Sequence, residues 1–248
     1  MIGYLILAVL VAFIAVVAIR TIRFRPKPQP AVTKEEIAFD KDAAVDSLAQ
    51  LVCCKTVSYN DHSLEDEGEF QKLISLLPTL YPNVFAACTF RQLPDRALLL
   101  RWPGKQEGDP AVMMAHYDVV PVNEEKWDKP PFAGVIEDGI LWGRGTLDTK
   151  VTFNGVLSAA NYLIGQGFQP EKDIYFAFSG GEEINGQGAP NIVAYFTEHG
   201  IHPAIVVDEG GAVVENVFPG VKQPCGLIGI AEKGMLNAQY RTVSAGGH

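Results

Sequence analysis

The sequence predicts an α/β fold with a largely parallel sheet, because short apolar segments alternate with segments whose apolar residues recur at helical spacing. The segment 111–115 is a continuous apolar run of strand length, and 149–164 places apolar side chains three and four positions apart. The expected elements are helices at 41–51, 68–77, 149–164 and 191–196, and strands at 97–102, 111–115, 141–142, 173–178 and 204–207. Pro78 is expected to end the second of these helices.

Length and composition restrict the function classes. The 248 residues are enough for one large α/β domain or two small ones, and 48% of them are hydrophobic. The formal net charge is -9, and no basic patch interleaved with aromatic residues occurs. We therefore expect no nucleic-acid partner.

The N-terminal segment differs from the rest of the chain. Residues 1–19 carry no charge, and as a helix they would span about 28 Å, close to the hydrocarbon thickness of a bilayer. Residues 20–35 contain a cluster of basic side chains followed by three prolines, which predicts a stiff spacer. A single-pass membrane anchor is favoured over a cleaved signal, which would begin with basic residues. The positive-inside rule places the basic flank in the cytoplasm, but translocation of a large domain overrides that rule, so the membrane side stays open.

Acidic residues and one histidine follow the predicted strands. His116 and Asp118 come directly after the strand at 111–115, and further carboxylates follow later apolar segments or glycine turns. The set is His116, Asp118, Asp148, Glu182, Glu183 and Asp208. Ligands bind at the carboxyl ends of strands in open α/β sheets, so these side chains are expected to converge. Imidazole and carboxylate groups gathered there predict a hydrolytic metal centre.

Five motifs occur in order along the chain. They are His116 to Pro121 (HYDVVP), Trp127 with residues 131–134 (PFAG), Gly143 to Lys150 (GRGTLDTK), Gly181 to Glu183 (GEE), and Asp208 to Gly211 (DEGG). Over residues 40–248 the chain resembles the co-catalytic dizinc metallohydrolase family that includes carboxypeptidase S, aminoacylase and acetylornithine deacetylase. HYDVVP and DEGG are most similar to the carboxypeptidase S and N-acyl-amino-acid hydrolase branch. The resemblance implies a zinc-peptidase-like catalytic domain with helices on both faces of the sheet.

The resemblance also implies a set of metal ligands. His116 and Asp208 would bind the first zinc, Asp148 would bridge both zincs, and Glu183 would bind the second. A complete active site would hold two Zn²⁺ ions, with Co²⁺ or Mn²⁺ as substitutes. In the family the peptide bond after the bridging aspartate is typically cis, which here is the bond between Asp148 and Thr149.

Two further residues would be catalytic by resemblance. Glu182 would be the general base, and Asp118 would hold the imidazole of His116. A base beside the metal centre takes the proton of the attacking water and returns it to the leaving amine. Adjacent Glu182 and Glu183 cannot point the same way from an extended segment, so one base and one ligand is a natural division.

The resemblance divides the rest of the chain as well. Residues 36–235 would be a catalytic domain, incomplete because the family's final histidine ligand comes from a returning segment, and 236–248 would open a lid or dimerisation domain. His248 matches a lid histidine that reaches substrate, and the lid implies a homodimer. A fragment of a longer protein is favoured over a truncated product.

The function expected is hydrolysis, by water and a glutamate base, of a peptide or N-acyl amide bond next to a free carboxylate. The expected partners are a peptide or N-acyl amino-acid substrate and a membrane. Two alternatives stay open: a deacetylase or desuccinylase of amino-acid metabolism, and a catalytically dead, membrane-tethered binding module.

Overall fold

The computed structural model describes residues 2–24, 37–231, 234, 236, 238–244 and 246. The chain divides into two compact units, Met1–Ala38 and Phe39–His248. The described part of the first unit is one helix, α1 (Ile2–Arg23), whose only charged residues, Arg20 and Arg23, lie in its last turn. This helix is long and apolar enough to cross a membrane, and a signal sequence would look the same.

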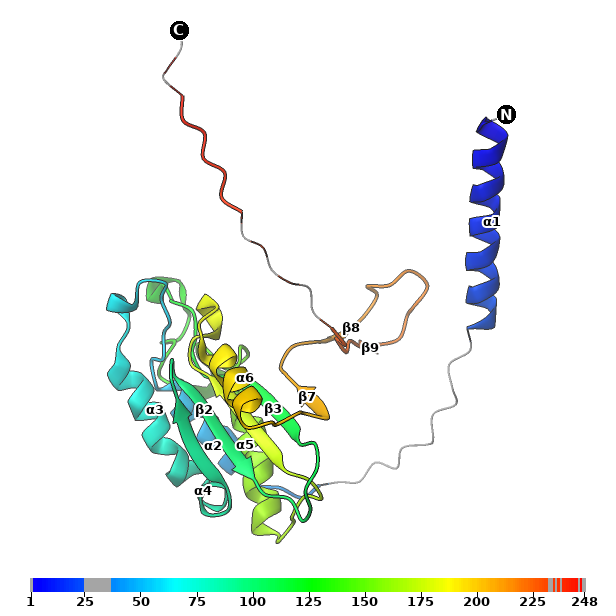
Figure 1. Ribbon diagram of the computed structural model, residues 1–248. Helices are drawn as coiled ribbons and strands as arrows, with labels where there is room; N and C mark the ends of the chain where they lie inside the picture. The colour runs from blue at the N-terminus through cyan, green and yellow to red at the C-terminus, as the bar shows by residue number, and fades with distance from the viewer. Residues whose placement is uncertain are drawn as a thin grey trace. The chain divides into compact units, whose positions relative to one another are not determined.

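A five-stranded sheet forms the centre of the second unit (Figure 1). Its spatial order is β1 (Thr89–Leu93), β2 (Ala97–Trp102), β6 (Ile174–Ser179), β3 (Ala111–His116) and β7 (Ile205–Val207). The last three strands run parallel, whereas β2 is antiparallel to β6 and β1 is antiparallel to β2. The predicted α/β class is therefore confirmed, with an antiparallel pair added at one edge of the parallel strands.

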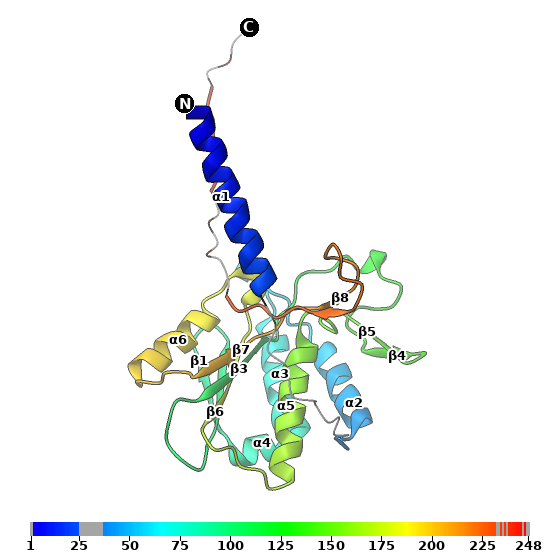
Figure 2. The same cartoon turned by 90° about the vertical axis from the view of Figure 1, so that its right-hand side faces the viewer.

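Helices cover both faces of this sheet, as expected (Figure 2). On one face lie α2 (Lys41–Val52), α3 (Glu67–Leu80), α4 (Pro82–Ala87) and α5 (Lys150–Gly165), and on the other lies α6 (Gly188–Glu198). Two small hairpins pair β4 (Val135–Glu137) with β5 (Ile140–Trp142) and β8 (Val213–Val214) with β9 (Cys225–Gly226). The short 3-10 helices are η1 (His62–Leu64), η2 (Glu124–Lys126) and η3 (Glu182–Ile184).

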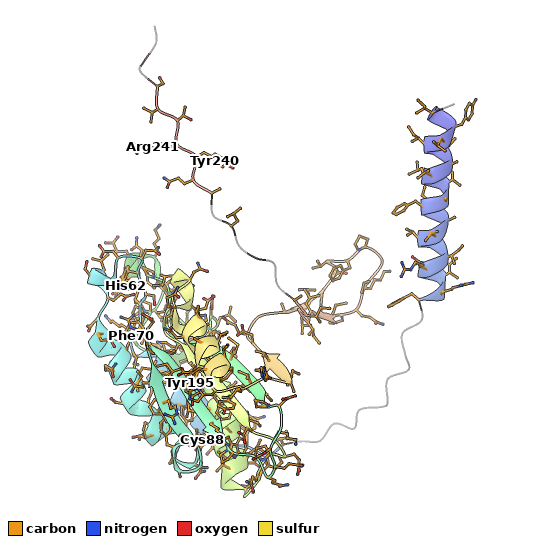
Figure 3. All side chains as sticks on the ribbon, in the orientation of Figure 1. His62, Phe70, Cys88, Tyr195, Tyr240 and Arg241 are labelled. Atoms are coloured by element: carbon orange, nitrogen blue, oxygen red, sulfur yellow. The ribbon has the colours of Figure 1, made fainter. Side chains whose placement is uncertain are left out.

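Alternation along the strands produces two hydrophobic cores. In β2, Leu98 and Leu100 point into the core beneath α3 and α5, while Ala97 and Leu99 point into the core beneath α6. Figure 3 labels a residue of each layer, Phe70 in the first core and Tyr195 beside the second. Burial on both faces explains why the central strands are continuous apolar runs in the sequence.

The second helix differs from the sequence expectation. Pro78 does not end it, because α3 continues to Leu80 with this proline inside its last turn. A proline there removes one backbone N–H donor, and its exposed position leaves the packing of the helix intact. Pro82 then begins α4, a short helix that the sequence did not predict, in the first helical position that prolines favour.

The register between β3 and β6 brings the ends of these two strands side by side. His116, the last residue of β3, lies opposite Ser179, the last residue of β6. The chain leaves β6 through Gly180, where a Cβ atom would come within 2.6 Å of the Tyr117 ring, so only glycine fits this close approach. The loops after these two strands are therefore held against each other at the carboxyl edge of the sheet.

Candidate metal centre

Three neighbouring parallel strands deliver the candidate residues to one edge of the sheet. β3 ends at His116, β6 leads into Glu182 and Glu183 of η3, and β7 leads into Asp208. Asp148 lies two residues before the start of α5, which packs against β3. The expected placement at the carboxyl ends of the strands is therefore what the structure shows.

The imidazole of His116 is the centre of the cluster. Its Nε2 lies 3.0 Å from Asp148 Oδ1, 3.1 Å from Glu209 Oε1 and 3.7 Å from Glu182 Oε2. Ligand atoms of His116, Asp148 and Glu183 also lie within 4.8 Å of one another, as do those of His116, Glu182 and Glu209. Two groups of potential ligands thus share one histidine.

Asp118 contacts both His116 and the turn that carries Glu182 and Glu183. Its fully buried carboxylate accepts the backbone N–H of Glu182 at 3.1 Å on Oδ1 and that of Glu183 at 3.2 Å on Oδ2. His116 Nδ1 faces the Asp118 carbonyl oxygen at 3.0 Å and its Oδ1 at 3.4 Å. Both of these partners are acceptors, so Nδ1 carries a proton, and Nε2 is the ring nitrogen directed at the other carboxylates of the cluster.

The electrostatics of the cluster favour a bound cation. Burial lowers the pKa of His116, but the carboxylates of Asp118 and Glu209 outweigh it and raise that pKa to about 11. Burial raises the pKa of Glu182, and Asp118 adds to the rise. Burial and the charge of Asp148 likewise raise the pKa of Glu183. The cluster therefore carries an excess of negative charge that a positive ion would balance.

The donor set fits a divalent metal such as zinc. One imidazole nitrogen and several carboxylate oxygens are the ligand types that zinc accepts in hydrolytic sites. Within the described part of the chain, no lysine or arginine pairs with Asp148, Glu182, Glu183 or Glu209. His116 is thus the one basic side chain that these carboxylates share among the described residues.

The segment after β7 presents an unexpected side chain. Asp208 is exposed, and its Oδ1 accepts the Glu209 backbone N–H at 2.8 Å. Glu209 instead reaches His116, which lowers the pKa of the glutamate. The chain bends at Glu209 after β7 ends at Val207, and in this bend the side chain of Glu209, not that of Asp208, faces the cluster. The assignment of Asp208 as a ligand stays a prediction.

Glu182 and Glu183 diverge for a reason other than the expected one. The segment is not extended but forms η3, which Asn185 ends in the left-handed conformation with φ of 52°. Successive residues of a 3-10 helix are about 120° apart around its axis, so the two carboxylates still point in different directions.

The Asp148–Thr149 peptide bond is cis, as the resemblance implies. His248 lies outside the described residues.

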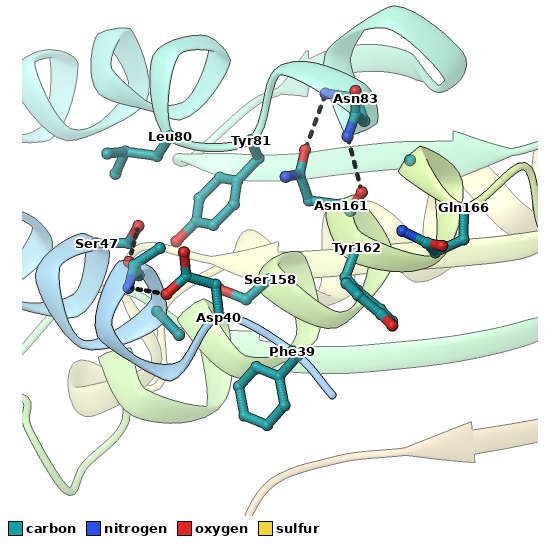
Figure 4. Close-up of a pocket in the computed structure, with 13 residues that line it drawn as sticks. Phe39, Asp40, Ser47, Leu80, Tyr81, Asn83, Ser158, Asn161, Tyr162 and Gln166 are labelled. Atoms are coloured by element: carbon teal, nitrogen blue, oxygen red, sulfur yellow. Dashed lines mark hydrogen bonds between the residues drawn. The ribbon is translucent and has the colours of Figure 1, made fainter. Parts of the chain in front are cut away.

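Two cavities lie along the loops that carry the cluster. One of about 270 Å³ is lined by Asp148, Arg144 and Trp127, whose ring lies 5.3 Å from the arginine guanidinium. Another of about 470 Å³ is lined by the glycine turn after β6, Ile184 and Arg96. A third cavity of about 280 Å³ lies between α2, α4 and the C-terminal end of α5 (Figure 4). None of the cluster residues lines the third cavity. It lies at the C-terminal end of α5, whereas Asp148 precedes the N-terminal end of that helix.

The sequence interpretation missed two residues of the site. Glu209 was part of the DEGG motif but received no role, and a strand-edge argument alone cannot choose between it and Asp208. Ser58 donates a hydrogen bond of 2.7 Å to Asp118 Oδ2 from a position 60 residues earlier. A single serine has no motif, so no sequence signal could have identified it.

The chain is similar in sequence to proteins of known families. "Probable carboxypeptidase S-like 2" of Dictyostelium discoideum is 36% identical over 208 residues, which cover 81% of this chain and 40% of the relative. "N-fatty-acyl-amino acid synthase/hydrolase PM20D1.1" of Danio rerio is 33% identical over 213 residues, covering 84% and 41%. The chain thus spans about 40% of the length of these relatives.

Solved structures share the fold. An M20 family metallo-carboxypeptidase, Sso-CP2 from Sulfolobus solfataricus, superimposes with a TM-score of 0.57 at 18% sequence identity, covering 72% of this chain and 39% of that one. Residues 112–245, which contain every described residue of the cluster, match the sequence model of "Peptidase family M20/M25/M40". The chain belongs to this peptidase family.

Proposed function

We propose that the protein is a zinc-dependent hydrolase that cleaves a peptide or N-acyl amide bond next to a free carboxylate. The observation that carries the proposal is the convergence of His116 Nε2 with the carboxylates of Asp148, Glu182 and Glu183 at the carboxyl edge of the sheet. Membership of a peptidase family supports the same chemistry.

The metal ligands are proposed from the resemblance and the geometry together. His116, Asp148 and Glu183 form one group of adjacent ligand atoms, so they would hold the metal whether Asp208 or Glu209 completes the set. When bound, divalent metal ions supply Lewis-acid polarisation and lower the pKa of water toward neutrality. The orientation of His116 by Asp118 suits this task, because the imidazole presents Nε2 outward.

Glu182 is the proposed general base. Its side chain is about half exposed at the cluster. Its pKa is raised toward neutral pH, which suits a group that must take up and release one proton in each turnover. In the proposed reaction Glu182 accepts a proton as the water oxygen adds to the amide carbon. It then donates that proton to the nitrogen as the C–N bond breaks, and transfer of the remaining hydroxyl proton to the amine yields a carboxylate and an ammonium group.

The substrate class is supported by two kinds of relative. One relative is named as a carboxypeptidase and the other as an N-fatty-acyl-amino acid hydrolase. Both names describe an amide whose nitrogen belongs to an amino acid with a free carboxylate. We therefore propose such an amide as the substrate here.

A substrate panel tests this proposal on the full-length protein. Dipeptides, long-chain N-acyl amino acids and N-acetyl amino acids are compared with matched substrates in which the carboxylate is an amide. We expect turnover that needs the free carboxylate, is lost in a chelator and returns with zinc. Failure of the zinc-loaded protein to hydrolyse any member, or equal turnover of the amidated substrates, would contradict the proposal.

We further propose that α1 anchors the protein in a membrane as a single-pass helix. Its 22 residues would extend about 33 Å, enough for the hydrocarbon core, and its basic last turn suits the interface with lipid headgroups. We expect the full-length protein in the membrane fraction, resistant to carbonate extraction, and the variant without residues 2–24 in the soluble fraction. A mature soluble protein that lacks this segment would identify it as a cleaved signal.

A further inference from the structure

Ser58 lies in a short segment that docks beside the end of β3. Its backbone N–H donates to Val119 O at 3.0 Å, and Val119 N–H donates to Thr56 O at 2.9 Å. The Thr56 hydroxyl donates to the carbonyl oxygen of Tyr117 at 2.6 Å. Thr56 and Ser58 are 0% and 1% exposed. The segment is therefore buried and hydrogen-bonded along residues 117–119, which follow His116.

The Ser58 hydroxyl has one strong acceptor. Its Oγ is 2.7 Å from Asp118 Oδ2 and 3.5 Å from the carbonyl oxygen of Gly180. A hydroxyl carries a single proton, and the shorter distance to a charged oxygen directs that proton to Asp118. This bond is shorter than the two that Asp118 accepts from the backbone of Glu182 and Glu183.

Asp118 joins the parts of the cluster that must keep a common geometry. It touches the imidazole of His116 and accepts both N–H groups of the turn that carries Glu182 and Glu183. A carboxylate with free torsion would satisfy only some of these donors at a time. Ser58 supplies the only side-chain hydroxyl among the donors to Asp118 in the described residues, and it comes from outside the loops that Asp118 organises.

We propose that Ser58 is a positioning residue for the hydrolysis, an inference that rests on the proposed function. Its hydroxyl fixes the rotation of the Asp118 carboxylate. That carboxylate then directs His116 Nε2 toward the metal and keeps Glu182 and Glu183 in their divergent orientations. Ser58 touches neither substrate nor metal and acts only through Asp118.

The test measures zinc affinity of the full-length protein by chelator competition, beside kcat for the best substrate of the panel. Loss of the hydrogen-bond partner of a metal ligand typically costs 10–100-fold in affinity or activity. Asp118 is such a partner and Ser58 acts one contact further out, so we expect Ser58→Ala to weaken zinc binding by about tenfold, the low end of that range. Thr56→Val is the matched control. It removes an equally buried hydroxyl from the same segment, but one that is bonded to a neutral carbonyl, so zinc affinity should change less than threefold.

A double-mutant comparison separates positioning from a general loss of stability. In an Asp118→Asn background, Ser58→Ala should change zinc affinity by less than threefold, because the group through which it acts is already altered. Additive effects of the two substitutions, or wild-type zinc affinity and kcat in Ser58→Ala, would overturn the inference. If Ser58→Ala does not fold, Ser58→Cys, which keeps the size with a weaker donor, takes its place.

The two proposals fail in different ways. A wild-type protein that binds no zinc and hydrolyses no member of the panel removes the proposed function itself. A wild-type protein that does both, with Ser58→Ala indistinguishable from it, removes only the role of Ser58. Restored zinc affinity in Ser58→Thr, which keeps the hydroxyl, would support that role directly.

Discussion

At the scale of single residues, Glu182 carries the sharpest prediction. Glu182→Gln keeps the size of the side chain but removes its ability to accept a proton, so turnover should fall by about 10²–10⁴ or more. Zinc content, measured by elemental analysis, should stay at the wild-type value because Glu182 is the proposed base and not a ligand. Loss of zinc with retained turnover in the occupied fraction would show that Glu182 and Glu183 have exchanged roles.

The neighbouring carboxylates Asp208 and Glu209 support a second prediction. The resemblance names Asp208, whereas the structure brings Glu209 to 3.1 Å from His116 Nε2. Because the structure directs only one of these two carboxylates at the cluster, only one of Asp208→Asn and Glu209→Gln should lower zinc occupancy. Loss in the first variant supports the resemblance, loss in the second supports the geometry, and loss in both or in neither contradicts the argument.

Much of the candidate site could be predicted from the sequence, and the exceptions have a common cause. His116, Asp148, Glu182 and Glu183 follow strands or glycine turns, so their convergence depends only on topology. The choice between Asp208 and Glu209 depends on dihedral angles in a loop whose next residues, Gly210 and Gly211, have φ of 97° and 78°. No periodicity in the sequence specifies such angles, because glycine adopts them freely.

At the scale of elements, α5 connects the core to the site. Asp148 precedes its first turn, and the helix packs against β3, α2 and α4. Phe153 lies between the rings of Tyr117 and Phe178, with centroids 5.8 and 4.5 Å away. Burial of this one helix therefore sets the distance between the strand that carries His116 and the loop that carries Asp148.

Two identical substitutions on α5 test that burial. Leu157 is 0% exposed and Leu163 is 38% exposed. Leu157→Ala should lower the free energy of unfolding by about 2–5 kcal/mol, because it leaves a cavity in the core. Leu163→Ala should cost less, about 1 kcal/mol, because more than a third of this side chain already meets water and its loss leaves no enclosed cavity in the core. Denaturant titration measures both, and equal losses would mean that the helix does not present these faces as described.

The elements that the sequence predicted share one property, a continuous or periodic apolar face. β2, β3 and β6 are buried on both sides, and α5 shows an unbroken helical repeat, so each produces a strong local signal. β1 was missed because it is an edge strand with three exposed residues among five, and its sequence TFRQL alternates poorly. α4 has six residues, too few for a helical period to emerge.

At the scale of the whole molecule, negative charge is concentrated where the proposed metal would bind. The chain has a net charge of -9, and several carboxylates surround His116 without a lysine or arginine partner among the described residues. Like charges at this spacing repel one another, and a divalent cation converts that repulsion into attraction. Metal content should therefore determine the stability of the folded protein as well as its activity.

This coupling predicts that one substitution has opposite effects in the two states of the site. In zinc-loaded protein Glu183→Gln should lower the Tm, because a proposed ligand is lost and binding no longer favours the folded state as strongly. In protein stripped by a chelator the same substitution should raise the Tm, because burial and Asp148 raise the pKa of Glu183 and its charged form is unfavourable there. For a domain of about this size, 1 kcal/mol corresponds to about 2–4 °C, which thermal unfolding resolves. A Tm that falls equally in both states would mean that Glu183 is an ordinary structural carboxylate and that the cluster around His116 holds no ion through it.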